Sequence, residues 1–349
     1  CIHTGQHYSY EMDRIFFEEL DLPEPEFKLD IRSRAPYMQG DHTGRMLIEI
    51  EKKLLEDMPY CIVVQGDTNT ALAGALVAGK ISTTESFTGF HIKVAHVEAG
   101  LRSYDRSMPE ETNRFLADHL ADFCLTPTRR GRKILLREGV PKSRIHVTGN
   151  TIVDVVMKYS KKAESEGVGL AGSDIAPNSG EVDFGLQKNK YILLTLHRQE
   201  NVDSEIRFKN ILQGLSLVSS KLNLPIVFLA HPRTWKMMQK FKIEMPKGIY
   251  QRQPQGFINF LQLEMNAALI LTDSGGVQEE SCVLKVPCVT LRDNTERPET
   301  VKVGANIIAG TKPKAILKAA IRMSRRKRTW KNPLGDGRAS ERILKILMR

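Results

Sequence analysis

The chain has 349 residues, which exceeds one domain of ordinary size and predicts two domains. Hydrophobic residues make up 41% of it and charged residues 26%, as in a soluble globular protein, and no apolar run is long enough to cross a bilayer. The net charge of +10 comes partly from the run Arg322 to Lys331. We interpret that run as a solvated helix face rather than a nucleic-acid site, because no zinc-finger or RNA-binding motif accompanies it.

The five cysteines show no spacing typical of a metal site. Cys61 and Cys124 fall in apolar, strand-like runs, where buried free thiols are common. This usage predicts a protein of the reducing cytoplasm.

From residue 42 onward, amphipathic helical segments alternate with short apolar segments. The predicted strands of this first stretch are 61–65, 91–99, 123–128 and 145–150, and the predicted helices are 43–58, 70–80, 129–139 and 151–160. This alternation predicts a doubly wound parallel sheet.

Residues 161–190 interrupt the alternation with Gly, Ser, Asp, Asn and Pro, which is the composition of a linker. A second alternation of apolar strands and helices then fills residues 191–333. We therefore expect two α/β domains, at 1–160 and 191–333, facing a cleft that binds ligands at the carboxyl ends of the strands. The terminal helix of residues 334–349 is expected to complete the first domain.

The segment LTDSGGVQEE (271–280) places small and acidic residues directly after an apolar strand. Glycines there let a ligand approach the backbone, and the following helix offers free N–H groups to an anion. A carboxylate one turn into that helix suits sugar hydroxyls better than a phosphate, as in dinucleotide sites. The segment thus indicates a nucleoside-diphosphate site, although many such turns serve only packing.

Polar side chains also follow the other predicted strands. They are Asp67, Glu98, Glu110, Arg114, His197, His231, Arg292 and Arg297. Each has a structural alternative, since Asp67 could cap the next helix and Glu110 could form a surface pair with Arg114. Together they would supply anion binding and proton transfer at a sugar ring.

Other chemistries lack their usual motifs. The sequence has no Walker-type phosphate loop, no GxGxxG after a strand and no HExxH. His96 and Glu98 share a strand face, yet we do not favour a metal site there, and we expect neither a metal nor a cofactor.

Eight motifs in fixed order carry a resemblance to a known family. They are QGDTNT, HVEAGLRS, PEETNR, LTPT, VTGNTIVD, TLHRQEN, LTDSGGVQEE and LRDNTERPE, spread between residues 65 and 299. They closely resemble the non-hydrolysing UDP-N-acetylglucosamine 2-epimerases, and the likeness covers nearly the whole chain.

The resemblance implies the two-domain Rossmann-like fold of many nucleotide-sugar glycosyltransferases (glycosyltransferase-B-like), with UDP bound mainly by the C-terminal domain. It implies interconversion of UDP-GlcNAc and UDP-ManNAc for cell-surface polysaccharides. Anti elimination of UDP gives 2-acetamidoglucal, a proton returns to the opposite face of C2, and UDP adds back. It also implies a cytoplasmic homodimer acting on a UDP-sugar.

Residue roles follow from the matched motifs. The resemblance implies catalytic roles for Asp67, Glu98, Glu110 and His197. It implies substrate binding by Arg114, by Phe260 at uracil, by Ser274, Gly275 and Gly276 at the diphosphate, by Glu280 at ribose and by Arg297 at phosphate. Gln6 and His7 match a motif that lines a second, activating substrate site in bacterial members.

The family usually begins with a strand that ends in a GTRPE-type loop, whereas this chain begins at Cys1. We expect a sheet without its first strand, and a chain that is poorly stable and nearly inactive as given. The alternatives in reaction type are a hydrolysing epimerase that releases ManNAc and UDP, a glycosyltransferase of the same fold and a non-catalytic binder of sugar nucleotides.

Overall fold

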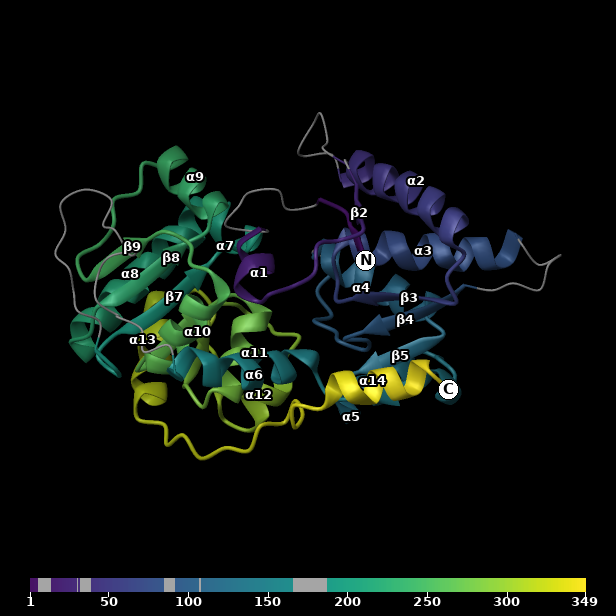
Figure 1. The fold of residues 1–349 in the computed structure, drawn as a ribbon. Helices are drawn as coiled ribbons and strands as arrows, with labels where there is room; N and C mark the ends of the chain where they lie inside the picture. Colours follow the sequence, from purple (N-terminus) through teal and green to yellow (C-terminus); the bar gives the residue numbers. More distant parts are fainter. Residues whose placement is uncertain (6–13, 30, 32–38, 85–91, 107, 166–186) are drawn as a thin grey trace. The chain divides into compact units, whose positions relative to one another are not determined.

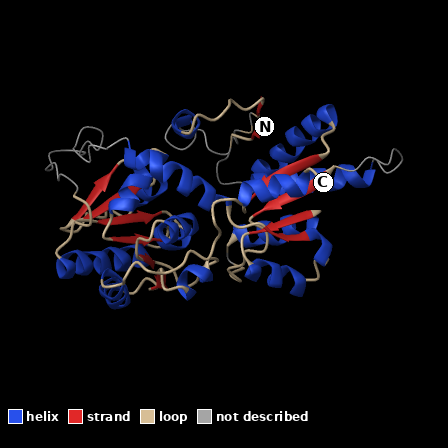
Figure 2. Cartoon of the chain, turned by 60° about the horizontal axis from the view of Figure 1, so that its bottom comes forward, coloured by secondary structure: helices blue, strands red, loops and turns tan. Residues whose placement is uncertain are grey.

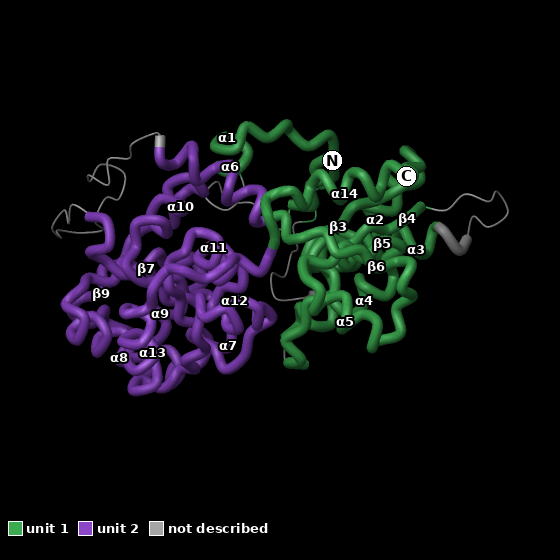
Figure 3. Tube along the Cα trace, turned by 90° about the horizontal axis from the view of Figure 1, so that it is seen from below, with its two compact units in different colours: residues 1–151, 335–349 green, residues 152–334 purple. Residues whose placement is uncertain are grey.

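The computed structural model describes residues 1–5, 14–29, 31, 39–84, 92–106, 108–165 and 187–349 (Figure 1). The chain forms two compact units (Figure 3). Unit 1 comprises Cys1–Thr151 and Gly335–Arg349, and unit 2 comprises Ile152–Leu334. Gln6, His7 and most of the predicted linker lie outside the described residues.

Unit 1 contains a four-stranded parallel sheet with helices on both faces (Figure 2). One face packs apolar side chains against α2 to α5, and the other packs Ala95, Val97 and Leu125 against Ile343 of the C-terminal helix. In order across the sheet, the strands are β3 (Cys61–Gln65), β4 (Lys93–Val97), β5 (Phe123–Thr126) and β6 (Ile145–Val147). The helices are α2 (Gln39–Asp57), α3 (Asn69–Thr84), α4 (Pro109–Leu120), α5 (Arg129–Arg137) and α14 (Ala339–Leu347), with a 3-10 turn at Lys142–Arg144.

Strand β3 is an edge strand within the described part of unit 1. Strands β1 (Ile2–His3) and β2 (Phe27–Lys28) pair separately with each other, and helix α1 spans Arg14–Glu19. A groove of about 490 Å³ is lined by residues of β1 and β3 together.

Unit 2 contains a six-stranded parallel sheet in the order β12-β11-β10-β7-β8-β9. This is the doubly wound order in which the winding reverses between β7 and β10, so a switch point lies between their carboxyl ends. The strands are β7 (Ile192–Leu196), β8 (Ile226–Ala230), β9 (Ile249–Arg252), β10 (Leu269–Thr272), β11 (Cys288–Thr290) and β12 (Asn306–Ile308).

Helices cover both faces of this sheet, which explains why its central strands are apolar at almost every position. Alternate residues show the division: Ile192 and Leu194 of β7 pack toward α8 and α13, whereas Leu193 and Tyr191, just before the strand, pack toward α10 and α11. The helices of unit 2 are α6 (Thr151–Ser165), α7 (Gln199–Val202), α8 (Glu205–Leu222), α9 (Pro232–Lys240), α10 (Phe257–Asn266), α11 (Gly275–Val283), α12 (Pro298–Lys302) and α13 (Pro313–Ser324).

The basic run after residue 322 is largely exposed to solvent, as the sequence predicts, but only its start is helical. Helix α13 ends at Ser324, and the segment beyond it is tied to unit 2. Arg326 donates to the carbonyl of Gly304 (3.0 Å), and Arg328 donates to that of Ala267 (3.1 Å). These arginines attach the segment after α13 to the rest of unit 2, because each donates a hydrogen bond to a backbone oxygen at a helix or strand end.

None of the described helices is both long and apolar enough to span a membrane.

Gly100 offers a stability test in unit 1. Its φ is +81°, and a Cβ there would lie 2.7 Å from the carbonyl oxygen of Gly131. Gly139 has a similar φ of +87° with open space around it. We expect Gly139→Ala to lower the free energy of unfolding by about 1–2 kcal/mol, because alanine disfavours the left-handed backbone. Gly100→Ala should lower it by about 1–3 kcal/mol more, because the new Cβ would overlap Gly131. Urea denaturation of both variants checks this, and equal losses would contradict the close approach.

Candidate active site

Strand β10 of unit 2 ends in the turn that the sequence singled out. The N–H of Ser274 donates to Thr272 Oγ1 (2.9 Å), and α11 begins at Gly275. A Cβ at Gly275 would lie 2.5 Å from Glu296 Oε1, so only glycine lets the 291–299 segment pack here. The first N–H groups of α11, at Gly275 and Gly276, therefore lie beside the switch point, a position suited to a diphosphate.

Asp273, directly before this turn, is fully buried and organises its surroundings. Its carboxylate accepts from the backbone N–H groups of His197 (3.1 Å) and Arg198 (3.0 Å) and from the Asn201 amide (3.1 Å). Burial alone would raise the pKa of Asp273, but His197 and these donors hold that pKa below its usual value. The sequence analysis did not assign Asp273 to the site, although it directly follows the strand.

His197 lies at the carboxyl end of β7, as predicted, and is partly exposed. Its Nδ1 lies 3.2 Å from Asp273 Oδ1, and the side chain is 36% exposed. Its ring lies 5.9 Å from that of His231, centroid to centroid. A histidine oriented by a buried carboxylate is a common arrangement for proton transfer.

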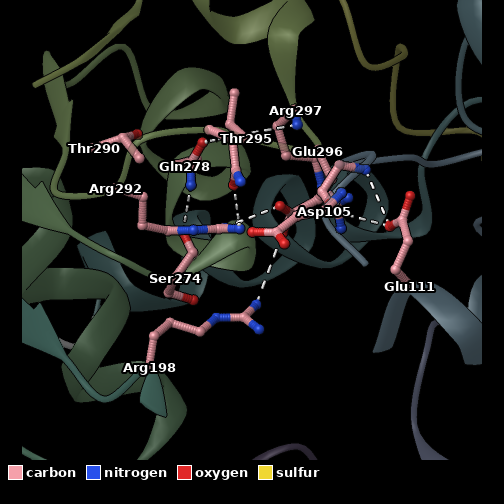
Figure 4. Close-up of polar contacts among 12 residues, drawn as sticks. Asp105, Glu111, Arg198, Ser274, Gln278, Thr290, Arg292, Thr295, Glu296 and Arg297 are labelled. Atoms are coloured by element: carbon pink, nitrogen blue, oxygen red, sulfur yellow. Dashed lines mark hydrogen bonds and ion pairs between the residues drawn. The ribbon is translucent and has the colours of Figure 1, made fainter. Parts of the chain in front are cut away.

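Arginines and glutamates from the 291–299 segment form a buried ionic cluster beside the turn (Figure 4). Glu296 pairs with Arg292 (2.9 Å) and lies 3.7 Å from Arg198. Arg297, predicted to contact phosphate, pairs with Glu279 of α11 at 2.6 Å. The paired carboxylates fix the guanidinium groups beside the start of α11, where they can add to the anion-binding potential of the helix.

Gln278 joins this segment to the turn. Its Oε1 accepts from Thr295 Oγ1 (2.6 Å), and its amide donates to the Ser274 carbonyl (3.1 Å). Because both ends of one buried side chain are bonded, the 291–299 segment and the start of α11 are held as one piece.

Glu280 and Glu264 form a buried pair of carboxyl groups between α11 and α10. Burial raises the pKa of Glu280 to about 7, and burial beside Glu280 raises that of Glu264 well above its usual range. Two adjacent buried carboxyls cannot both ionise cheaply, so the pair retains a proton near neutral pH. Phe260, on α10, is half-buried against the same core. The ribose and uracil roles of Glu280 and Phe260 stay predictions.

In unit 1, Asp67 follows β3 and is fixed from two sides. Its carboxylate accepts from Arg114 Nε (3.0 Å) and Nη2 (2.5 Å), and its carbonyl accepts from the Asn113 amide (2.9 Å). The alternative that Asp67 caps the next helix is not needed, because Thr68 Oγ1 accepts the N–H of Ala71. Because Arg114 is buried, its role goes beyond a surface pair with Glu110.

The PEE motif begins helix α4, with Pro109 at its first position. Glu111 accepts from the backbone N–H groups of Ser103 (3.1 Å) and Tyr104 (2.8 Å) and from Arg114 Nη1 (2.6 Å). Burial alone would raise the pKa of Glu111, but these donors lower it. Glu111 thus anchors the preceding loop and orients the arginine that holds Asp67, a role that the sequence did not reveal.

Glu98 follows β4 in a left-handed conformation, with φ +71°. Such backbone is costly for a residue other than glycine and is concentrated at functional sites. Its carboxylate accepts from the Gln65 amide at 3.0 Å. Since β3 and β4 are neighbours in the sheet, Asp67 and Glu98 share its carboxyl edge. Glu110 lies in the first turn of α4, the helix that supplies Arg114.

Replacing Asp273 by Asn should destabilise the protein. An asparagine amide would face the N–H groups of His197 and Arg198, and breaking such a buried pair costs about 3–5 kcal/mol. Asp293, exposed and paired with Arg207, is the control, and Asp293→Asn should cost less than about 1 kcal/mol.

The loss of stability in Asp273→Asn should depend on pH. Because the folded-state pKa of Asp273 is lowered, its contribution is present above the unfolded value of 3.8 and disappears as pH falls through the folded value. Urea denaturation at neutral and acidic pH measures this. A difference between wild type and D273N that does not shrink in acid would contradict the account.

Comparison with known proteins identifies the family. The family profile described as UDP-N-acetylglucosamine 2-epimerase matches residues 1–348. A UDP-N-acetylglucosamine 2-epimerase of Methanocaldococcus jannaschii is 52% identical over 99% of this chain and 90% of its own. A crystal structure of the M. jannaschii UDP-GlcNAc 2-epimerase, in complex with UDP-GlcNAc and UDP, superposes with a TM-score of 0.87 at 51% identity. It covers 99% of this chain and 91% of that one.

The fold is shared more widely. The glycotransferase of kitacinnamycin, at 10% identity, matches with a TM-score of 0.52 over 93% of this chain and 87% of its own. Together with the parallel sheets of both units, this confirms the predicted α/β, glycosyltransferase-like fold class. The chain belongs to the UDP-N-acetylglucosamine 2-epimerase family.

Proposed function

We propose that this protein interconverts UDP-GlcNAc and UDP-ManNAc by inverting C2, without releasing the free sugar. The observation that carries the proposal is the Asp273–Ser274–Gly275 turn at the switch point of unit 2. This turn is bordered by His197 and by a buried arginine cluster. That arrangement suits a nucleoside diphosphate, and the relatives named above are UDP-N-acetylglucosamine 2-epimerases.

Unit 2 would hold the UDP group. The N–H groups at the start of α11 and the guanidinium of Arg297 would receive the diphosphate. Glu280 would accept hydrogen bonds from the ribose hydroxyls, and Phe260 would stack on uracil. Because the turn is locked by Gln278 and Asp273, these groups need little reorganisation when UDP binds.

The reaction would begin with cleavage of the bond between C1 and the phosphate oxygen. The electron pair leaves with UDP, the C2 proton passes to a base, and a C1–C2 double bond forms. The C2 proton is not acidic by itself, so departure of UDP must run ahead and build oxocarbenium character that nearby carboxylates stabilise. A proton then returns to the other face of C2, and retained UDP adds back at C1.

Unit 1 and His197 would supply the proton transfers. Asp67, fixed by Arg114 and Asn113, suits electrostatic stabilisation of the cationic sugar. Glu98, in its strained turn, and Glu110, at the start of α4, are the candidates for base and acid.

Three further features are proposed with this activity. A reducing cytoplasm is the setting expected from the cysteine usage, since Cys124, Cys282 and Cys288 are buried free thiols. A homodimer is expected from the family resemblance, and gel filtration with light scattering tests it. The second substrate site at Gln6 and His7 rests on the motif alone.

NMR analysis of products formed from UDP-GlcNAc in D2O tests the function. We expect UDP-ManNAc with deuterium at C2 and no accumulation of free UDP, because the proton returned to C2 comes from a group in exchange with solvent. ManNAc with free UDP would show the hydrolysing alternative instead. Product without deuterium at C2 would contradict the proposed proton transfer.

In the same assay, Glu98→Gln should slow turnover about 10²–10⁴-fold, the usual contribution of a general acid or base. Glu49→Gln is the matched control, because Glu49 is an exposed carboxylate on α2 paired only at the surface, with Lys52. It should leave the rate unchanged. A rate for Glu98→Gln within twofold of wild type would remove Glu98 from the mechanism.

A further inference from the structure

His96 on β4 is the most deeply buried histidine in the described part of unit 1, and the proposed mechanism does not use it. Its side chain is 1% exposed. Nδ1 lies 2.7 Å from Asp118 Oδ1 of α4, and Nε2 lies 2.8 Å from the carbonyl oxygen of Gly66. The ring therefore bridges a buried carboxylate and the turn that presents Asp67.

Both partners of the ring are hydrogen-bond acceptors. A carbonyl oxygen cannot donate. The carboxylate of Asp118 already accepts from the Gly100 N–H (3.1 Å) and pairs with Arg102 Nη1 (2.7 Å). A neutral imidazole donates from one nitrogen only, so it would set a lone pair against one of these oxygens. Only the doubly protonated imidazolium satisfies both contacts.

The surrounding charges balance such a cation. Asp118 lies between His96 and Arg102, and Arg102 continues to Glu138 at 2.6 Å, so two cations alternate with two anions. Of the other groups facing the ring, the Glu98 carboxyl raises the pKa of His96. The Cys124 thiol on β5 stays neutral because burial raises its pKa to about 12.

The balance of these effects favours the cation. Burial alone would lower the pKa of His96, but Asp118, Gly66 and Glu98 raise it above the usual 6.5.

We propose that His96 is a positioning residue: as an imidazolium, it clamps the carbonyl of Gly66 and so sets the place of Asp67 at the edge of the sheet. The proposal rests on the proposed function, in which Asp67 acts on the sugar. Gly66 has φ +72°, and its N–H donates to the Val97 carbonyl at 3.0 Å, so both polar atoms of this glycine are held by β4. The His96–Asp118 pair also supports the backbone at Glu98. Asp118 accepts a hydrogen bond from the N–H of Gly100, two residues after Glu98.

Proton-detected ¹⁵N NMR of the histidine rings tests the protonation state without an activity assay. At pH 7.5 both ring nitrogens of His96 should carry protons. His146 on β6, whose pKa burial lowers, should be neutral in the same spectrum and serves as the internal control. A neutral His96 at this pH would overturn the proposal.

Kinetics of His96→Gln test the positioning role, with His146→Gln as the matched control. Displacement of a reacting group by about 1 Å costs about 10²-fold. We therefore expect kcat of H96Q to fall by about that factor while UDP affinity, measured by calorimetry, stays within twofold. A purely structural role would not lower kcat while leaving UDP affinity unchanged. A wild-type kcat in H96Q would overturn the proposal.

The pH profile gives a second readout. The raised folded-state pKa means that the clamp is present at low pH and is lost as pH rises through that value. Wild-type kcat should therefore show an alkaline limb that moves to lower pH in Asp118→Asn, and an unmoved limb would contradict the clamp. If wild type produces no UDP-ManNAc, the proposed function fails, whereas the NMR titration still decides whether His96 is the buried imidazolium.

Discussion

The buried carboxylate of Asp273 is the contact on which the candidate site of unit 2 depends. It joins the end of β10 to the backbone after β7 and, through Asn201, to the carbonyl of Leu291 after β11. Three loops that begin on three strands are thereby fixed to one oxygen pair at the switch point. A carboxylate with this many donors stays ionised in the protein interior, and its partners keep their positions before any ligand arrives.

Unit 1 uses the same device twice. Asp118 holds the ring of His96 and the N–H of Gly100, and Glu111 holds the loop before α4 and the side chain of Arg114. In each case a buried carboxylate supports a half-buried one, Glu98 or Asp67, that we propose acts on the sugar. The protein thus keeps its supporting acids ionised by internal donors and leaves others accessible to a substrate.

The sequence predicted the alternation of strands and helices and the residues at strand ends, because apolar runs and small residues mark both locally. It did not reveal Asp118, Glu111 or Asp273 as supports, since their partners are fixed only by the packing of distant segments. Helix α4 is not among the helices predicted from the sequence, although proline fits the first turn of a helix. The basic run is exposed as predicted, but it is not helical beyond Ser324, where Arg326 and Arg328 donate to backbone carbonyls that no sequence pattern reveals.

We propose a division of labour, in which unit 2 holds UDP and the carboxylates of unit 1 act on the sugar. Calorimetry of UDP binding to Glu280→Gln and Asp67→Asn tests it most directly. A buried hydrogen bond to a charged group contributes about 1.5–3 kcal/mol, so E280Q should bind UDP about 10–100-fold more weakly. D67N should bind it within twofold of wild type while losing epimerisation. A loss of UDP affinity in D67N as large as that in E280Q would contradict the account.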